Sequence, residues 1–398
     1  MTLEKMKQQL DIGKIPDCFC EIWEEIKDTY ESHGANVLSD NYILTTLEEC
    51  YALEAYRSVI VEAAAQVREN PAMVLLVCLL ERWVRSGLEA NFKEYEAPQG
   101  EGLAYDFLHL FPAIPSMPGS VKYMRERGVP EDIVAATMQE YDYCVEERHK
   151  HNAWGRPVFD CARLDWMKRL VVNRLIRIGR LKYDLPRKRI TDIQVYRNTE
   201  GEICVLADGV QVHRDGGFLG SAGLEDPTGS FYAEVDEQED AIVGYPVVDG
   251  YVRNEKVHLR KCEWEQCLSS EDDVIMVHIP PGSGFDRENV EASYARAREI
   301  FRDCYPDFPY KAFWCHFWLM SLQLREVLER SSNIRSFQEK FTMYPSKSKG
   351  IYVLYNVFHT SKLPEDLRML PEDTSLQRRV KKMCLEGKYF HEFSGFFF

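Results

Sequence analysis

His278 is the residue whose type and position first indicate chemistry in this sequence. It lies near the end of a short apolar run, Val274 to Ile279, and prolines and glycines follow at 280–284. The run is rich in β-branched residues and predicts a buried strand, and the breakers after it predict a turn. An imidazole with an unperturbed pKa of about 6.5 can accept a proton at neutral pH. A histidine where a strand meets a loop is therefore a candidate general base.

The segment that follows has the backbone shape of an anion site. From residue 286 the apolar spacing becomes helical, with Val290 and Phe301 among the periodic positions. A strand, a glycine-rich loop and a helix in succession suit an anion, because the unpaired amides at a helix start carry partial positive charge. Gly282 and Gly284 would let the backbone approach a phosphate closely.

A second segment, residues 313–320, supplies two more reactive side chains, Cys315 and His316. His316 competes with His278 as the base, and the two could act together if both face one cleft. Cys315 could act as a nucleophile that becomes acylated. A structural role for His278 also remains open, since a histidine before a Pro-Pro turn can bond to a loop carbonyl.

The bulk composition is that of an ordinary globular protein. The 398 residues suffice for two or three domains, and 45% of them are hydrophobic and 28% charged. A formal net charge of −15 argues against general binding to nucleic acid or to anionic membranes. The longest apolar run, 72–80, is followed by charged residues and predicts a buried helix rather than a membrane span. The first residues lack the apolar core of a signal peptide, so we expect a cytoplasmic location.

The twelve cysteines form neither a disulfide framework nor a metal motif. Cys18 and Cys20 make a C-x-C pair, Cys262 and Cys267 lie five residues apart, and no C-x-x-C pair occurs. Histidines do not cluster with them. We expect reduced thiols and no bound metal.

The periodicity of the apolar residues predicts an α+β fold with two domains. Residues 1 to about 150 read as helices, whereas alternation of apolar and polar residues begins after Arg180. We place the boundary at residue 155, with a helical domain over 1–155 and a mixed domain over 156–398. In the second part, hairpins are predicted at 193–206 and 247–252, further strands at 257–259, 274–279, 311–318 and 351–358, and helices at 286–301, 321–341 and 374–386. Strands that alternate with helices but also form hairpins predict a mixed sheet flanked by helices.

The glycine-dense segment 215–223 does not match a dinucleotide-binding fingerprint, because no helical pattern follows it. We interpret it as a flexible connection, with a substrate lid as the alternative.

Several motifs of the C-terminal half, in their order along the chain, resemble those of a bacterial family of two-domain acyltransferases that includes the enzymes that lipidate glycopeptide antibiotics. The matching positions are His278-Ile-Pro, Gly282, Gly284, Ser293, Cys315, Trp318-Leu319, Ser332-Asn333-Ile334, Phe337 and Pro371-x-x-Thr374-Ser-Leu-Gln-Arg, together with Gly179-Arg-Leu-Lys-Tyr183. The sequence departs from the family pattern at His316-Phe317 and at Leu322, where a small residue and a proline are expected. These differences bear on the acceptor more than on the reaction class.

The resemblance implies a helical N-terminal domain followed by a GNAT-like domain that binds acyl-CoA. In such domains two neighbouring parallel strands move apart and the donor enters the gap, which places the two strands here at 274–279 and 311–318. The residues implied in coenzyme A binding are Met276, Val277, Ile279, Gly282, Ser283, Gly284, Phe285, Arg287, Asn333 and Phe337. Direct transfer is the common route in this class, so a role for Cys315 is secondary.

The function implied is that of an acyl-CoA-dependent N-acyltransferase. An acyl group would pass from a thioester, carried by coenzyme A or by an acyl-carrier protein, to a small amine by direct attack, with His278 or His316 as base. The alternative is a non-catalytic protein that binds acyl-CoA or acyl-carrier protein and needs no base. A nucleotide-binding enzyme is disfavoured because the glycine loop lacks the Lys-Ser/Thr of a phosphate-binding loop.

Overall fold

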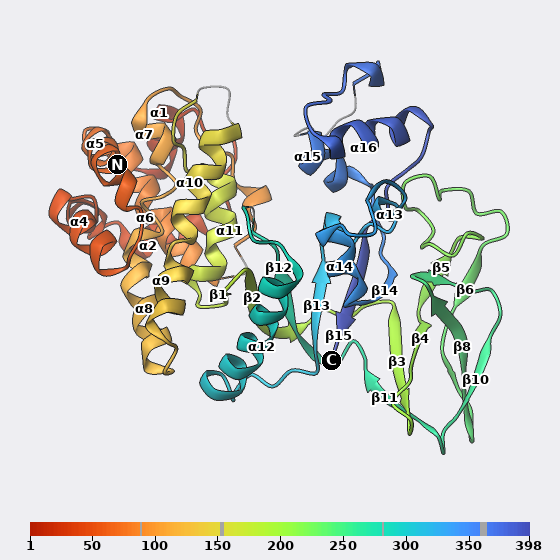
Figure 1. The fold of residues 1–398 in the computed structure, drawn as a ribbon. Helices are drawn as coiled ribbons and strands as arrows, with labels where there is room; N and C mark the ends of the chain where they lie inside the picture. Colours follow the sequence, from red (N-terminus) through yellow and green to blue (C-terminus); the bar gives the residue numbers. More distant parts are fainter. Residues whose placement is uncertain (88–89, 152–154, 281, 359–363) are drawn as a thin grey trace. The chain divides into compact units, whose positions relative to one another are not determined.

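The computed structural model of the chain describes residues 1–398 except 88–89, 152–154, 281 and 359–363 (Figure 1). Contacts between backbone segments divide it into two compact units, unit 1 (Met1–Gly179) and unit 2 (Arg180–Phe398). The sequence placed the division at residue 155. Helix α11 (Cys161–Val171) packs against α6 (Pro71–Arg85) and α8 (Met117–Glu126), and this packing holds residues 156–179 in unit 1.

Unit 1 is helical, as its apolar periodicity predicts. Its α-helices, besides α6, α8 and α11, are α1 (Leu3–Gln9), α2 (Phe19–Ile26), α3 (Tyr30–Val37), α4 (Asp40–Glu49), α5 (Arg57–Arg68), α7 (Leu103–Phe107), α9 (Glu131–Met138) and α10 (Glu140–His151). Helix α6 begins at Asn70, whose side chain accepts from the amides of Ala72 and Met73, with a proline in the first turn. Its apolar residues are buried around most of its circumference, so α6 is the central helix of the unit.

The apolar spacing predicts a helix over 164–177, but α11 already ends at Val171. Asn173 adopts a left-handed conformation with φ 57°, which stops the helix. A short strand, β1 (Leu175–Ile178), follows it. No strand occurs among the described residues of 1–150.

Unit 2 contains a mixed sheet whose strands lie in the order β2-β12-β13-β15-β14. They are β2 (Leu181–Lys188), β12 (Asp273–His278), β13 (Ala312–His316), β14 (Thr342–Pro345) and β15 (Phe393–Phe397). Strands β12 and β13 are parallel, whereas the other neighbours are antiparallel. The α+β fold class and the mixed sheet predicted from the sequence are confirmed.

A second, antiparallel sheet is inserted between β2 and β12 in the chain. Its order is β10-β8-β4-β3-β11, and β7 and β9 pair with β8. The strands are β3 (Ile193–Asn198), β4 (Ile203–Ala207), β7 (Asp236–Glu237), β8 (Ala241–Val248), β9 (Tyr251–Val252), β10 (Val257–Arg260) and β11 (Trp264–Leu268), and β5 (Val210–Val212) pairs separately with β6 (Phe231–Ala233). Both predicted hairpins are confirmed. The tip of the second has Asp249 and Gly250 at positive φ, 52° and 83°, as a tight hairpin turn requires.

The helices of unit 2 correct two of the sequence predictions. They are α12 (Arg287–Cys304), α13 (Leu324–Val327), α14 (Asn333–Glu339), α15 (Ile351–Phe358) and α16 (Ser375–Leu385), with short 3-10 turns η5 (Trp318–Met320) and η6 (Leu367–Met369). The single helix predicted over 321–341 is wrong, because the chain forms two short helices there. The strand predicted over 351–358 is also wrong: this segment is helix α15, which packs against α16 and η5. Periodicity cannot separate a strand from a buried helix in so short an apolar run.

The core of unit 2 lies on both faces of the mixed sheet. On one face Val274 and Trp314 pack with Val195 and Val205 of the second sheet. On the other face the ring of Phe313 contacts the rings of Tyr183, Tyr294 and Phe397, at centroid distances of 5.0 to 5.9 Å. The sheet is thereby held between the second sheet and α12.

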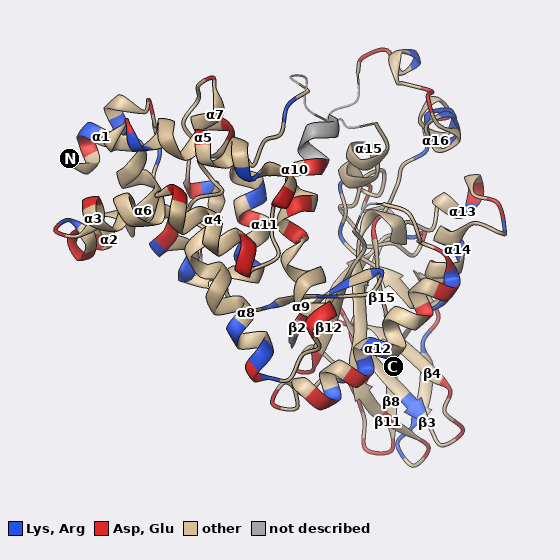
Figure 2. Cartoon of the chain, turned by 60° about the vertical axis from the view of Figure 1, so that its left-hand side comes forward, with Lys and Arg blue, Asp and Glu red and all other residues tan. Residues whose placement is uncertain are grey.

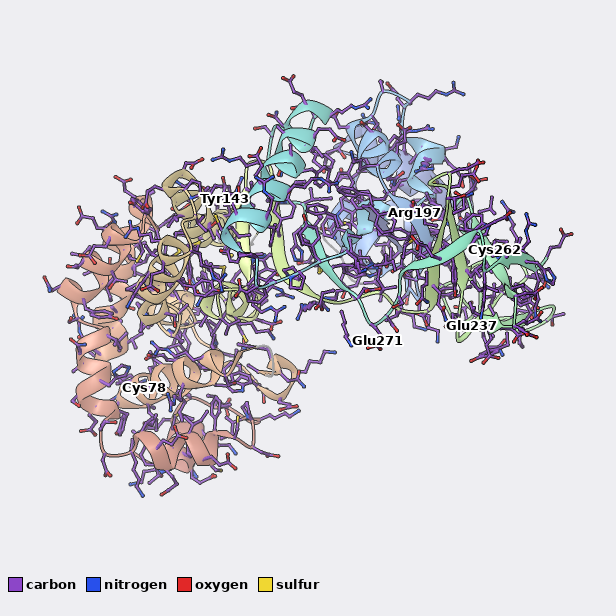
Figure 3. All side chains as sticks on the ribbon, turned by 90° about the horizontal axis from the view of Figure 1, so that it is seen from below. Cys78, Tyr143, Arg197, Glu237, Cys262 and Glu271 are labelled. Carbon is purple, nitrogen blue, oxygen red and sulfur yellow. The ribbon has the colours of Figure 1, made fainter. Side chains whose placement is uncertain are left out.

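The cysteines show no pairing in the described chain, where all twelve are free thiols. Cys78 lies among the helices of unit 1 (Figure 3). No group of three or more His, Cys, Asp or Glu that could hold a metal ion occurs among the described residues. No single described helix is long and apolar enough to cross a membrane, although the bent pair 54–68 and 71–85 satisfies that test jointly by length and composition.

Replacing Phe313 tests how far the sheet depends on this aromatic packing. Phe313 is fully buried, so Phe313→Ala should lower the free energy of unfolding by about 3–5 kcal/mol. Tyr232→Ala is the control, since Tyr232 is 50% exposed and its loss should change stability by less than about 0.5 kcal/mol. Urea unfolding followed by circular dichroism measures both. A loss below about 1 kcal/mol for Phe313→Ala would contradict the packing described.

Candidate active site

The candidate site is an opening between β12 and β13. The two parallel strands are paired at three positions, the last of which joins Met276 to Trp314. Beyond that point β12 still pairs with β2 as far as His278, and β13 still pairs with β15 as far as His316. β12 is therefore held by β2 and β13 by β15, while the sides of β12 and β13 that face each other separate. We call this gap, bounded by residues 277–278 and 315–316, the strand opening.

Backbone polarity makes the strand opening a place for an extended ligand. The carbonyl of Asp273 accepts from the amide of Lys311, at 2.9 Å, so the peptide groups of Asp273 face β13. Because successive residues of a strand turn their peptide groups to opposite sides, those of Ile275 and Val277 also face β13. The last pair with β13 is at Met276, and a parallel pair at that position uses the N–H of Val277, so the C=O of Val277 is the first backbone group of β12 to face the gap.

The two histidines flank the strand opening on the same face of the sheet. Each lies two residues beyond the last pair, Met276 and Trp314, and therefore on the same side as that pair. Had the pairing continued, His278 would lie directly opposite His316. The structure thus brings together the two bases that the sequence proposed.

His278 lies against a buried carboxylate that the sequence did not single out. Its Nε2 is 3.5 Å from Oδ2 of Asp184 on β2. The Asp184 side chain is only 1% exposed, and guanidinium groups of Arg187 and Arg189 lie 3.4 and 4.0 Å from it. A carboxylate with cationic neighbours can orient the ring and stabilise the imidazolium that forms when His278 takes up a proton.

His316 lies in a different environment, with both ring nitrogens directed at neighbouring side chains. Its Nδ1 is 3.2 Å from the hydroxyl of Ser394, and its Nε2 is 3.7 Å from a carboxylate oxygen of Glu392. The ring stacks on Trp314, with an angle of 13° between the planes. Burial lowers the pKa of His316 and raises the pKa of Glu392, so desolvation outweighs the attraction between them. These three contacts fix the orientation of the His316 ring.

Cys315 is poorly placed as a nucleophile. Its side chain is fully buried, on the face of the sheet opposite the two histidines. Burial raises the pKa of the thiol, whereas nucleophilic attack requires the thiolate. The geometry therefore argues against Cys315 as a nucleophile.

The glycine-rich loop adopts a conformation that depends on glycine. Gly282 and Gly284 have φ values of 109° and 77°, and a Cβ at Gly282 would meet no atom within 4 Å. The loop is held by Arg180, which donates to the carbonyl of Gly282 at 3.2 Å and lies over the ring of Phe285 at 5.4 Å. Ser283 is exposed, and Pro281 of the predicted turn lies outside the described residues.

The start of α12 is less open to an anion than the sequence suggested. Asp286 caps the helix and accepts from the amide of Asn289, which holds the pKa of that carboxyl below its usual range. A carboxylate therefore already occupies one amide that a phosphate would use. The exposed Arg287 and the nearby Arg180 supply the positive charge, so the loop itself is the better place for a phosphate.

Phe337, which the sequence predicts as a contact of coenzyme A, packs beneath the glycine-rich loop and is not part of the loop's exposed surface. Its ring is 3% exposed and lies 5.3 Å from the ring of Phe285. Asn333 is exposed at the start of α14, one turn before Phe337. Met276 on β12 and Ile279, directly after β12, are half-buried. Contact of these residues with coenzyme A stays a prediction.

The sequence missed Asp184, Glu392 and Ser394 as site residues. One signal was present, because Lys182 and Asp184 alternate with apolar residues in a strand whose first six residues are all buried. Charged side chains are rarely buried without a partner or a role. Nothing local in the sequence indicates that Glu392 and Ser394 meet His316, since that contact depends on the pairing of β13 with β15.

The lowered pKa of His316 gives a pH-dependent test of this geometry. The ring C–H resonances of His316 should titrate with a midpoint below about 6.5, the ordinary value. The pKa of His316 is lower in the folded protein than in the unfolded chain. Neutral His316 therefore contributes to the free energy of unfolding above the ordinary pKa, and this contribution is lost as the pH falls through the folded-state pKa. NMR of protein with labelled histidines measures the midpoint, with His316→Gln assigning the resonance and the urea-unfolded chain as reference. A midpoint at or above the unfolded value would contradict the environment described.

Comparisons with known proteins agree with this architecture. Residues 175–397 match the family described as "GNAT-like C-terminal domain". No curated protein matches the chain.

Solved acyltransferase structures share the fold over the whole chain. One is an acyltransferase mutant in complex with octanoyl-CoA, with a TM-score of 0.62 and 17% identity, covering 100% of this chain and 99% of that one. Another is an acyltransferase in complex with decanoyl-CoA and teicoplanin, with a TM-score of 0.62, 18% identity and the same coverage. At this level of identity the likeness establishes the fold. Since the family match spans more than half of its residues, the chain belongs to the family of proteins with a GNAT-like C-terminal domain.

Proposed function

We propose that this protein transfers an acyl group from the thioester of acyl-CoA to the nitrogen of a small amine by direct attack. The observation that carries the proposal is the strand opening, which leaves peptide groups of β12 facing a gap flanked by two histidines. Acyltransferases of the same fold have been solved with octanoyl-CoA, with decanoyl-CoA and with teicoplanin, which supports acyl-CoA as donor here.

Coenzyme A would bind along β12 and over the loop that follows. An amide N–H of its pantetheine arm would donate to the C=O of Val277, as a neighbouring strand would. Its pyrophosphate would lie against the amides of residues 282–285, where positive φ at Gly282 and Gly284 keeps the backbone accessible. Arg180 and Arg287 would offset its charge.

The thioester then lies between His278 and His316. The amine nitrogen attacks the thioester carbonyl carbon, forming an N–C bond, and the C–S bond breaks as coenzyme A leaves as a thiolate, which takes up the proton that His278 has accepted from the amine. His278 accepts the proton that the amine loses, and Asp184 stabilises the resulting imidazolium. Backbone N–H groups at the opening can donate to the thioester oxygen as negative charge develops there.

His278→Ala tests the assignment of the base. Turnover should fall by about 10²-fold or more while acyl-CoA affinity changes little, because a base acts along the reaction path and not on donor binding. The acidic limb of the pH–rate profile should also flatten. Release of free thiol from acyl-CoA in the presence of a panel of amines measures the rate.

Two further variants sharpen that result. Asp184→Asn should lower the rate in the same direction, since it removes the charge that stabilises the imidazolium. His316→Ala is the matched control, and a larger loss there than in His278→Ala would reverse the two assignments. If the wild type binds acyl-CoA yet releases no thiol with any amine, the protein is a binding protein and not an enzyme.

Gly282→Val tests the donor site independently of chemistry. A side chain at Gly282 would block the close approach of backbone and phosphate, so coenzyme A affinity should fall about tenfold or more. Gly201→Val is the matched control, because Gly201 also has positive φ, 88°, and open surroundings but lies at a distant hairpin tip. Isothermal titration calorimetry compares the two folded variants. Equal affinity in both would place coenzyme A elsewhere.

A further inference from the structure

Two neighbouring arginines of unit 2 have no carboxylate partner. Arg325 on α13 and Arg335 on α14 are half-buried, and neither forms an ion pair with any residue that the structure describes. The segment between them contains two acidic residues, Glu326 and Glu329, but both are paired with basic residues on or just after α16, at 2.6 and 3.0 Å. Figure 2 shows basic and acidic residues around α13 and α14. The acids of this segment therefore leave the two arginines without a counterion.

The hydrogen bonds of Arg335 leave one edge of its guanidinium open. Its Nη1 donates to the carbonyls of Arg325 and Leu328, each at 3.3 Å. Its Nε is buried without an acceptor, and its Nη2 donates to no group within the described ranges of the chain. Nε and Nη2 together can bind an oxyanion through two parallel hydrogen bonds. Arg302 binds the carboxylate of Asp303 through this same edge, at 2.7 and 2.8 Å.

The far end of the Arg325 guanidinium is open as well. Its Nε donates to Oε1 of Gln338 at 2.7 Å, whereas its terminal nitrogens have no acceptor in the described part of the protein. Gln338 is fully buried and is fixed in turn, since its Nε2 donates to the carbonyls of Leu319 and Ser321 at 2.6 and 3.0 Å. Burial lowers the pKa of Arg325, and the like charge of Arg335 lowers it further. An anion bound by both guanidiniums would offset that repulsion.

Helix α14 connects the two arginines with both parts of the proposed active site. The ring of Phe337 on α14 packs against Phe285 of the glycine-rich loop, with 5.3 Å between the ring centroids. The next residue, Gln338, is bonded to η5, the turn that follows His316 after Phe317. A substrate that occupies the loop or the strand opening would therefore lie near Arg325 and Arg335.

We propose that Arg325 and Arg335 form an oxyanion site that binds a phosphate or carboxylate group of a substrate. The inference rests on the proposed function, since it requires a substrate at the loop or in the strand opening. One source of the anion is the phosphate on the ribose of coenzyme A, which the pantetheine of a carrier protein lacks. The other source is the carboxylate of an acceptor that is an amino acid.

Charge favours the phosphate as the occupant. A phosphate monoester has a charge of about −1.5 to −2, which two guanidiniums match more closely than they match the single charge of a carboxylate. The pyrophosphate of coenzyme A would already be bound at residues 282–285, so the ribose phosphate is the group left to bind. This assignment would make free acyl-CoA, and not an acyl-carrier protein, the donor.

Dephospho-coenzyme A tests this source, because it lacks only the ribose phosphate. Isothermal titration calorimetry of the full-length wild type should show coenzyme A binding about tenfold or more tighter than dephospho-coenzyme A. In Arg335→Gln the two affinities should agree within about twofold. Arg335→Lys keeps the charge but lacks the open edge, so the ratio of affinities should also fall, although less.

Arg330→Gln is the matched control. Arg330 is exposed in the same segment and has no ion pair or hydrogen bond from its side chain among the described residues, so this variant removes an equal charge and leaves the arginine pair intact. Its ratio of affinities should stay within about twofold of that of the wild type. Thermal unfolding of each variant confirms that it is folded.

Amines that differ only in a carboxylate test the second source. Thiol release from acyl-CoA is compared for phenylalanine and phenethylamine. A preference of about tenfold or more in kcat/KM for phenylalanine, lost in Arg335→Gln and kept in Arg330→Gln, would assign the oxyanion site to the acceptor.

The inference is overturned if the wild type shows neither preference, or if folded Arg335→Gln keeps whichever preference the wild type has. Thiol release by the wild type would then leave the proposed function intact. Absence of acyl-CoA binding by the wild type would overturn the proposed function itself, and the inference with it.

Discussion

The one-sided pairing of β12 and β13 is the constraint on which the arrangement of unit 2 depends. Backbone N–H and C=O groups in a sheet are almost always paired, and a gap between neighbouring strands is therefore costly unless something fills it. Here β2 holds β12 as far as His278, and β15 holds β13 as far as His316. The gap persists because each strand is fixed from outside, so it does not close by local repacking. A ligand with amides along its length can take the place of the missing pairs.

The surroundings of the two histidines separate roles that the sequence could not. A base needs a partner that stabilises the charge it acquires, and Asp184, with Arg187 and Arg189 beside it, is such a partner for His278. Glu392 is surrounded differently, with the hydroxyl of Ser348 and the backbone of Tyr352 as neighbours, and its pKa is raised by burial. Its weaker tendency to ionise makes it a poorer stabiliser of an imidazolium. The electrostatics therefore favour His278, although both rings lie on the same face of the sheet.

Local patterns in the sequence were enough to predict the fold class, both hairpins, and the strand, loop and helix around His278. They also placed both histidines in the correct strands, although the strand of His316 was predicted to continue to residue 318 and β13 ends at His316. The partners of those histidines could not be predicted, because Asp184 reaches His278 across an antiparallel pair and Glu392, which contacts His316, directly precedes the last strand, β15. Such contacts depend on the order of strands in the sheet, and the periodicity of apolar residues predicts single strands but not their order. The sequence also places Asp286 at the start of the α12 helix. Only the structure shows that its carboxylate accepts from the N–H of Asn289 and so occupies an amide that a phosphate would use.

The failure to predict α15 as a helix has the same cause as the exposure of its outer face. An amphipathic helix shows a polar side at a period of about 3.6 residues, and residues 351–358 lack one, so the pattern resembled a buried strand. A short helix without a polar side has no reason in folding alone to leave Ile351, Tyr352 and Tyr355 in water. Conflicts of this kind between local sequence and solvent exposure occur mainly where function requires them.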